Sequence, residues 1–311
     1  MNSTPSGPSS AVRFESAARD CAGAQQAGIS LGQDPKSIRS GPAEAKVSER
    51  SPSGARLRFA NVQKSFGVGS DSRVALADVT LAVNAGEFLS IVGPSGCGKS
   101  TLLQIAAGLL APSGGQVLLD EKPVTGPPDH MVYLFQQYSR SLFPWRTALD
   151  NVAFAVEHKT SSRTRARKHS RRYLAMVGLG EFDRHYPWQL SGGMQQRVVI
   201  ARALAAEPHV LLLDEPFSSV DALTRVELHT LILDLWREHG FTIVLVTHDV
   251  DEAVFLADRV AVLSQQPSIV LQDIPTELPR PRDPIGTRES ARFLALRHEL
   301  LTTLLGRSRD A

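Results

Sequence analysis

The residues with the clearest chemical potential form a glycine-rich stretch in the first half of the chain. It reads Gly93-Pro94-Ser95-Gly96-Cys97-Gly98-Lys99-Ser100, with Thr101 following, and matches the complete P-loop pattern between a strand and a helix. Its glycines let successive backbone amides turn inward, and a helix N-terminus adds the positive end of its dipole. The stretch is predicted to bind phosphate, with Lys99 on the terminal phosphates and the Ser100 hydroxyl as a ligand of Mg²⁺.

Two adjacent carboxylates end an apolar run further along the chain. The sequence of residues 209–216 is HVLLLDEP, which is typical of a buried strand that ends in Asp214 and Glu215. Asp214 is placed to hold Mg²⁺ directly or through water. Glu215 points another way and could polarise an attacking water. An apolar run that ends in Asp-Glu is a strong indication of a nucleotide site only because a complete P-loop precedes it in this sequence.

A serine and two glycines open a helix-like segment before these carboxylates. Ser191, Gly192 and Gly193 belong to the segment LSGGMQQR, and the exposed amides with the serine hydroxyl would form a second anion-binding helix terminus. This segment resembles the signature motif of the ATP-binding cassette family. Met194 stands where that family usually has glutamine.

The resemblance extends from about residue 57 to about residue 263 and implies roles for four further residues. Phe66 matches the aromatic that stacks on adenine, although a surface-loop aromatic is the alternative. Gln136 resembles the glutamine that contacts Mg²⁺ and water and senses a membrane partner. Asp221 lies at the D-loop position, where Ser219-Val220 replace the common Ala-Leu. His248 resembles the switch histidine that bonds the γ-phosphate.

The resemblance implies an enzyme that hydrolyses ATP with Mg²⁺. Lys99 and the P-loop amides would neutralise the separating phosphate, Glu215 would orient or deprotonate water, and His248 and Gln136 would complete the catalytic set. Family geometry also implies that the signature of one copy closes over ATP on the P-loop of another. Each motif occurs once in this sequence, so two chains are expected to form a homodimer.

Alternating strand-like and helix-like stretches imply an α/β layered core with a mostly parallel sheet. Strands are expected at 57–62, 74–83, 87–92, 210–213 and 242–246, and helices at 100–110, 164–177, 191–206, 222–238 and 251–257. The fold class implied by the resemblance is the P-loop NTPase ABC-type nucleotide-binding domain, a mixed, mainly parallel sheet with an antiparallel β subdomain and a helical signature subdomain.

Composition changes along the chain predict its domain organisation. Residues 1–54 are rich in Ser, Pro, Gly and Ala and are expected to be a disordered tail. Residues 55–285 would form the ATPase domain, with a helical subdomain at about 143–190. Residues 286–311 would form a C-terminal helical extension, whose helix-like part, 289–305, is expected to pack against the core.

The composition of the 311 residues excludes several classes of protein. Lys and Arg number 34 against 32 Asp and Glu, and this near-neutral total disfavours a nucleic-acid partner. No apolar stretch approaches the roughly 20 residues that cross a bilayer, and Cys21 and Cys97 cannot form a disulfide framework.

Two local features have expected roles of their own. Cys97 is expected to contribute mainly its backbone amide. The basic run 158–172 is expected to be a solvated helix face, with contact to anionic lipid as the alternative.

With no span of its own, such a cassette is expected to act on an integral membrane permease, as a peripheral protein on the cytoplasmic face of the inner membrane. An extracytoplasmic solute-binding protein would act indirectly. Residues 141–147 (SLFPWRT) and 278–283 (LPRPRD) look like the nitrate/sulfonate/taurine importer branch. Ordinary packing is the alternative for Phe143 and Trp145. A soluble cassette ATPase acting on ribosomes or DNA is the alternative function.

Overall fold

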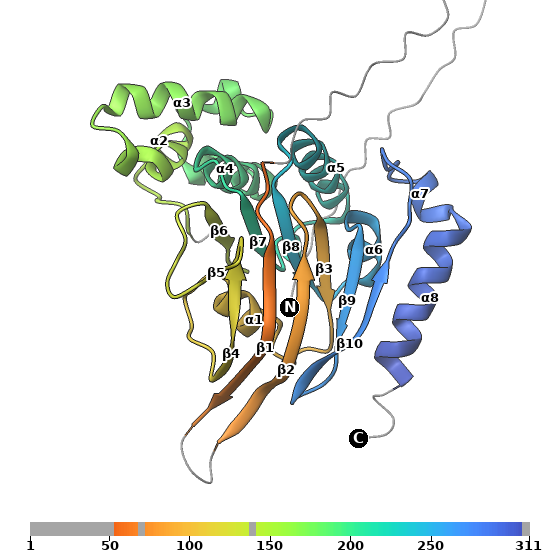
Figure 1. Ribbon diagram of the computed structural model, residues 1–311. Helices are drawn as coiled ribbons and strands as arrows, with labels where there is room; N and C mark the ends of the chain where they lie inside the picture. Colours follow the sequence, from red (N-terminus) through yellow and green to blue (C-terminus); the bar gives the residue numbers. More distant parts are fainter. Residues whose placement is uncertain (1–52, 68–71, 137–140, 307–311) are drawn as a thin grey trace, which may run out of the picture. The chain divides into compact units, whose positions relative to one another are not determined.

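The structure is a computed structural model that describes residues 53–67, 72–136 and 141–306. Residues 1–52 of the predicted tail, Cys21 included, lie outside the described residues. Within the described ranges, ten strands form one sheet in the order β5-β4-β1-β2-β10-β9-β3-β8-β7-β6 (Figure 1). The strands are β1 (Leu57–Phe66), β2 (Arg73–Val83), β3 (Phe88–Val92), β4 (Gly114–Leu119), β5 (Lys122–Pro123), β6 (Met131–Leu134), β7 (Val210–Asp214), β8 (Thr242–Thr247), β9 (Arg259–Leu263) and β10 (Ser268–Pro275).

Five strands of this sheet, from β9 to β6, are parallel. Their side chains alternate between two cores, so that Leu211 and Leu213 of β7 join one cluster while Val210 and Leu212 join the other. Burial on both faces explains why these strands are continuous apolar runs. Because the strands run in one direction, the segments that follow β3, β7 and β8 meet at one edge of the sheet.

The other half of the sheet is antiparallel. Strand β1 pairs with β2 and β4, and β10 joins the halves by pairing parallel to β2 and antiparallel to β9. Helix α1 (Lys99–Ala106) contributes Leu102 and Leu103 to the core that these strands share with β3, β7 and β8. The fold class is therefore confirmed as a mixed, mainly parallel sheet with an antiparallel part.

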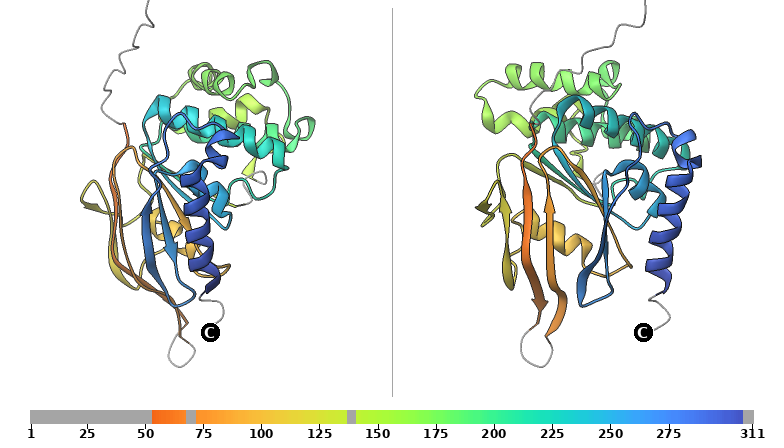
Figure 2. Two further views of the ribbon diagram at one scale, coloured as in Figure 1. Left: turned by 90° about the vertical axis from the view of Figure 1, so that its right-hand side faces the viewer. Right: turned by 45° about the vertical axis from the view of Figure 1, so that its right-hand side comes forward.

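The remaining helices cover the opposite face of the parallel strands and one end of the sheet. They are α2 (Ala148–Ala153), α3 (Arg163–Met176), α4 (Gly192–Ala205), α5 (Ala222–His239), α6 (Val250–Leu256), α7 (Gly286–Glu289) and α8 (Ala291–Gly306). Figures 1 and 2 show α2, α3 and α4 gathered at one end, whereas α8 runs beside β9 and β10. Helix α8 also packs against α6, through a face that buries Phe293, Leu296 and Leu300, which confirms the expected packing of this segment.

Several expectations are corrected by the structure. Helix α1 ends at Ala106 and not at residue 110, because Gly108 adopts a left-handed conformation (φ 67°) and lies against Gly126. In the basic run, most Arg and Lys side chains are exposed, as expected for a solvated face. Arg167 is the exception, since it donates two hydrogen bonds of 2.7 Å to the buried carboxylate of Asp150 on α2. Strands β4, β5, β6, β9 and β10 had no predicted counterpart.

The helices of the predicted helical subdomain, about 143–190, also pack against the helix that follows it. Helix α4 packs against both α2 and α3, so the helix that follows the signature motif belongs to the same cluster. The domain boundaries as a whole stay a prediction. Among the described residues, no helix combines the length and apolar character needed to cross a membrane.

Candidate functional site

The loop between β3 and α1 forms a cradle of backbone amides. Gly96 (φ 77°) and Gly98 (φ 104°) adopt left-handed conformations that side chains rarely tolerate, and a Cβ built on Gly93 would lie 2.9 Å from Cys97 Sγ. No side chain caps the N-terminus of α1 and no acidic residue stands in its first turn. Its first amides therefore lack partners within the helix and suit an anionic group.

The side chain of Lys99 folds back into this cradle. Its Nζ donates to the carbonyl oxygens of Gly93 (2.8 Å) and Pro94 (2.9 Å), and the residue is only 5% exposed. A buried ammonium held by neutral carbonyls can exchange them for phosphate oxygens, which are stronger partners. The loop and its lysine therefore fit the phosphates of a nucleotide.

Asp214, at the end of β7, has a partner for each carboxylate oxygen. Ser100 Oγ donates to Oδ1 (2.9 Å), and Tyr133 OH, from β6, donates to Oδ2 (2.8 Å). Burial raises the pKa of Asp214, and the two hydrogen bonds, which lower it, offset this effect only in part. Burial beside Asp214 also raises the pKa of the Tyr133 hydroxyl, so Tyr133 remains a hydrogen-bond donor. Sequence reasoning missed Tyr133.

Ser100 and Asp214 provide the oxygen atoms that Mg²⁺ prefers. Among the described residues no group of three or more His, Cys, Asp or Glu side chains could hold a metal ion. This donor set fits Mg²⁺ better than a metal caged by protein alone, since Mg²⁺ takes one or two carboxylates together with substrate phosphates. Gln136 does not join this pair, because its amide Nε2 donates instead to Glu215 Oε2 (2.9 Å).

Glu215 brings together the other two predicted catalytic side chains. Its Oε2 accepts from Gln136, and His248 Nδ1 lies 3.2 Å from the same oxygen. Glu215 has a left-handed backbone (φ 47°), which costs a non-glycine residue about 1–2 kcal/mol, and its amide donates to Val246 O of β8 (2.9 Å). In this backbone conformation the Glu215 carboxylate lies next to His248 and Gln136. It stands at the same edge of the sheet as Asp214.

The signature residues form a separate group with the D-loop residue. Ser191 caps α4 by accepting from the amide of Met194 (3.3 Å), and Asp221 caps α5 by accepting from the amide of Thr224 (3.0 Å). A Cβ on Gly193 would lie 2.6 Å from Thr224 Cγ2, so the two helix starts pack closely. Within the described ranges, no hydrogen bond or ion pair joins Ser191, Gly192 or Gly193 to the P-loop.

Three other predicted residues have simpler surroundings. Phe66 is 45% exposed at the end of β1, with Lys64 Nζ 5.1 Å from its ring centre. Cys97 is a buried free thiol, and burial raises its pKa, so the thiol is held protonated as an inert side chain. Thr101 follows Ser100 in the first turn of α1.

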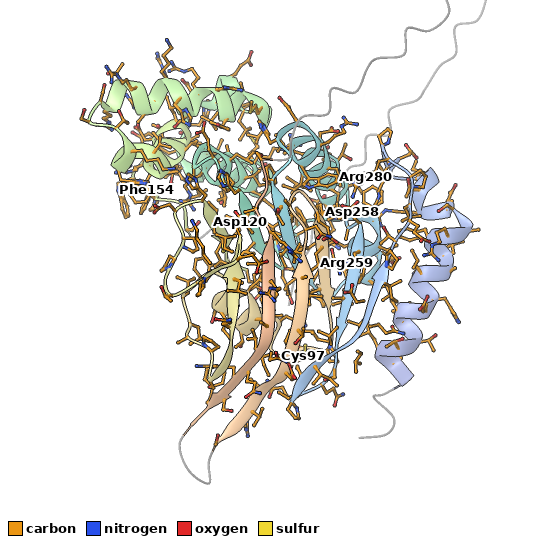
Figure 3. The ribbon with its side chains drawn as sticks, viewed as in Figure 1. Cys97, Asp120, Phe154, Asp258, Arg259 and Arg280 are labelled. Carbon is orange, nitrogen blue, oxygen red and sulfur yellow. The ribbon has the colours of Figure 1, made fainter. Side chains whose placement is uncertain are left out.

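The segment 141–147 presents an aromatic cluster next to α2. Phe143 packs edge-on against Phe154 at 4.8 Å and lies 5.5 Å from Trp145, while Arg146 stacks on both phenylalanine rings. Trp145 is 71% exposed, and Phe154 is labelled at the helical end of the fold in Figure 3. Phe143 is thus explained by packing, whereas the exposure of Trp145 is not.

The fold and the phosphate cradle define a P-loop nucleotide-binding domain, and the comparisons with known proteins agree. The family described as ABC transporter matches residues 76–218. An aliphatic sulfonates import ATP-binding protein of Bacillus licheniformis is 44% identical, over 77% of this chain and 90% of that protein. A nitrate import ATP-binding protein of Synechococcus elongatus is 44% identical, over 81% of this chain and 92% of that protein.

A solved structure gives the same answer. A dimeric ATP-binding cassette bound to ADP and Pi has a TM-score of 0.61 and 36% identity, covering 70% of this chain and 98% of that one. The chain belongs to the ABC transporter family. It is an ABC-type ATPase that binds ATP.

Proposed function

We propose that this chain is the ATP-hydrolysing subunit of an importer for a small oxyanion such as an aliphatic sulfonate, taurine or nitrate. It would work as a homodimer on the cytoplasmic face of the inner membrane, against an integral permease that receives its solute from an extracytoplasmic binding protein. The names of the sulfonate and nitrate relatives, each 44% identical, support the substrate class.

The residues at the carboxyl edge of the sheet would carry the reaction. Lys99 would exchange its two carbonyl partners for the terminal phosphate, and the amides from Gly96 to Thr101 would bind the remaining phosphate oxygens. Glu215 would orient and deprotonate the attacking water, with His248 and Gln136 fixing that carboxylate. Mg²⁺, held by Ser100 and Asp214, would neutralise charge on the phosphate oxygens when bound. Phe66 would stack on adenine.

One observation carries the dimer in this proposal, namely the separation of the two motif groups. The P-loop, Asp214, Glu215 and His248 lie at one edge. Ser191, Gly193 and Asp221 form the other group, and in the part of the chain that the structure describes no hydrogen bond or ion pair joins them to the P-loop. Ser191 and Gly192 are exposed, so their helix terminus is open to a group from outside the chain. ATP bound to the P-loop of one copy would meet Ser191 of a second copy.

The permease would be engaged through Trp145 and Gln136. Gln136 contacts Glu215 directly, and the exposed Trp145 lies in the same connection between β6 and α2. A membrane partner that moves this connection would therefore displace the Glu215 carboxylate as well.

Vesicle uptake tests the proposed function. The chain would be reconstituted with its permease and binding protein in proteoliposomes, and uptake of labelled taurine, an aliphatic sulfonate and nitrate would be followed with ATP supplied to the chain. Uptake of at least one of these oxyanions is expected, and Lys99→Ala should abolish it together with ATP turnover. Wild-type turnover without uptake of any of the three would contradict the substrate class.

A further inference from the structure

The helix that follows His248 is short and buried along most of its length. Helix α6 has seven residues, of which all but Asp251 are buried. Asp249, next to His248, starts it by accepting from the amide of Glu252 (3.1 Å). Because so short a helix has little stability of its own, its position depends on its contacts with the rest of the fold, and those at its far end are among them.

That far end is held by the segment LPRPRD, a motif that the catalytic roles leave unexplained. Arg282 donates from Nη1 to the carbonyl oxygens of Val254 (3.1 Å) and Phe255, and from Nη2 to that of Ala257 (2.7 Å). Arg280 Nη2 donates to the carbonyl oxygen of Leu256 (3.0 Å). The two guanidinium groups thus satisfy all four terminal carbonyls, from residue 254 to residue 257, that lack a partner in the helix.

Both arginines are fixed in turn by neighbouring groups. Arg280 donates to Asp258 Oδ1 (2.7 Å) and stacks 4.2 Å from the ring centre of Trp236 on α5. Arg282 is 8% exposed and also donates to Thr276 Oγ1 (3.1 Å). Their positive charges complement the negative end of the α6 dipole. Figure 3 shows Arg280 and Asp258 beside each other near α6, away from Cys97 of the P-loop.

We propose that Arg282, supported by Arg280, is a positioning residue for His248, acting through α6. Seven residues span about 10 Å of helix, so the guanidinium groups lie one helix length from the histidine and do not touch the reacting atoms. Loss of the fork leaves buried carbonyls without donors, which disfavours the last turn. The helix would then settle differently, and His248 Nδ1 would no longer lie 3.2 Å from Glu215. This inference rests on the proposed role of His248.

ATP turnover of the full-length chain tests the proposal, with Arg282→Lys as the central variant. Lysine keeps the charge but cannot reproduce a fork to three carbonyls. We expect kcat to fall about 10- to 100-fold, since small displacements of a catalytic group cost that much, while KM for ATP changes less than about 3-fold because the P-loop is untouched. Arg280→Gln, at a more exposed site, should cause a smaller fall of the same kind.

A double variant separates positioning from a merely structural role. His248→Ala alone should lower kcat about 100-fold or more, and adding Arg282→Lys should then change kcat less than about 2-fold, because the histidine it positions is gone. Arg292→Gln is the matched control: Arg292 also donates to carbonyls, but its hydrogen bonds go to Pro275, Thr276 and Glu277, which lie outside α6. Its kcat should stay at the wild-type value.

Three results would overturn the inference. These are wild-type kcat in Arg282→Lys, a full additional loss when it is combined with His248→Ala, or an equal loss in Arg292→Gln. If Arg282→Lys does not fold, the kcat of Arg280→Gln is measured alone and in combination with His248→Ala. The same criteria then decide whether the inference holds. Wild-type turnover in His248→Ala would instead refute the proposed role of His248, and the uptake assay separately tests the importer.

Discussion

At the scale of single residues, the site depends on carboxylates whose oxygens are held by specific donors. Asp214 uses Ser100 and Tyr133 for its two oxygens, and Glu215 places one oxygen between Gln136 and His248. Fixed donors of this kind orient a metal ligand or a base before the substrate arrives. The adjacent carboxylates differ in their partners, which supports the different roles proposed for them.

Tyr133→Phe should weaken Mg²⁺ binding without weakening nucleotide binding. The change leaves Asp214 Oδ2 buried without its donor, and loss of such a supporting hydrogen bond typically costs about 10- to 100-fold in metal affinity. Calorimetric titration of Mg²⁺ into the ATP-bound chain measures this, alongside ATP titration without metal. Tyr173→Phe removes a comparable hydroxyl-to-carboxylate bond (3.1 Å to Glu207) and should change neither. Unchanged Mg²⁺ affinity in Tyr133→Phe would contradict the supporting role.

The sequence motifs indicate the residues of the candidate site but not most of the side chains that support them. Motifs of a few consecutive residues predicted five of the site residues, namely Lys99, Ser100, Asp214, Glu215 and His248. Tyr133 could not be predicted, since it meets Asp214 only through the pairing of β6 with β7, and β6 has just four residues. Arg282 belongs to the motif LPRPRD, but its guanidinium donates to carbonyl oxygens about 25 residues earlier in the chain. The spacing of residues in the sequence does not reveal this contact.

At the scale of elements, the helices with strong local signals were the ones predicted well. Ser191, Asp221 and Asp249 each cap the helix that follows them, and side-chain caps of this kind are readable in a sequence. Strands β4, β5 and β10 are partly exposed, so they lack the continuous apolar runs that marked β7 and β8. Their pairing depends on distant partners, which a local pattern does not encode.

Arg167→Gln should loosen the contact between α2 and α3. Burial alone would raise the pKa of Asp150, yet the hydrogen bonds and charge of Arg167 hold it below its usual value. Because the carboxyl pKa is lowered in the fold, this stabilisation is present above the unfolded pKa of about 4 and is lost as pH falls through the folded pKa. We expect the free energy of unfolding at pH 7 to fall by about 1–2 kcal/mol. The loss is kept small because Arg167 is partly exposed and because Arg163 remains 3.5 Å from Asp150.

Urea unfolding at pH 7 and at pH 3 measures that difference. The gap between wild type and Arg167→Gln should shrink at the lower pH, where Asp150 starts to take up a proton. Arg171→Gln removes a pair in which Arg171 is 59% exposed and should cost no more than about 1 kcal/mol. A gap that is equal at both pH values would show that Arg167 stabilises the fold by packing rather than by its charge.

At the scale of the whole molecule, the motif residues form two groups that no hydrogen bond or ion pair joins within the described ranges. Large apolar side chains are exposed near the second group, namely Trp188 (66%) just before Ser191 and Leu223 (80%) just after Asp221. Exposed apolar residues beside an open helix terminus are typical of a surface that is covered on assembly. The proposed homodimer would cover them and complete each ATP site with residues from both copies.

Association of Glu215→Gln in MgATP tests this central claim most directly. The variant keeps the ATP contacts but lacks the base, so turnover should fall about 10²- to 10⁴-fold and bound ATP should persist. Sedimentation velocity is expected to show a dimer with MgATP and a monomer without it, and Ser191→Arg in the same background should remain monomeric because its side chain blocks the open helix terminus. Monomers of Glu215→Gln at saturating MgATP, with ATP bound, would contradict a site shared between two copies.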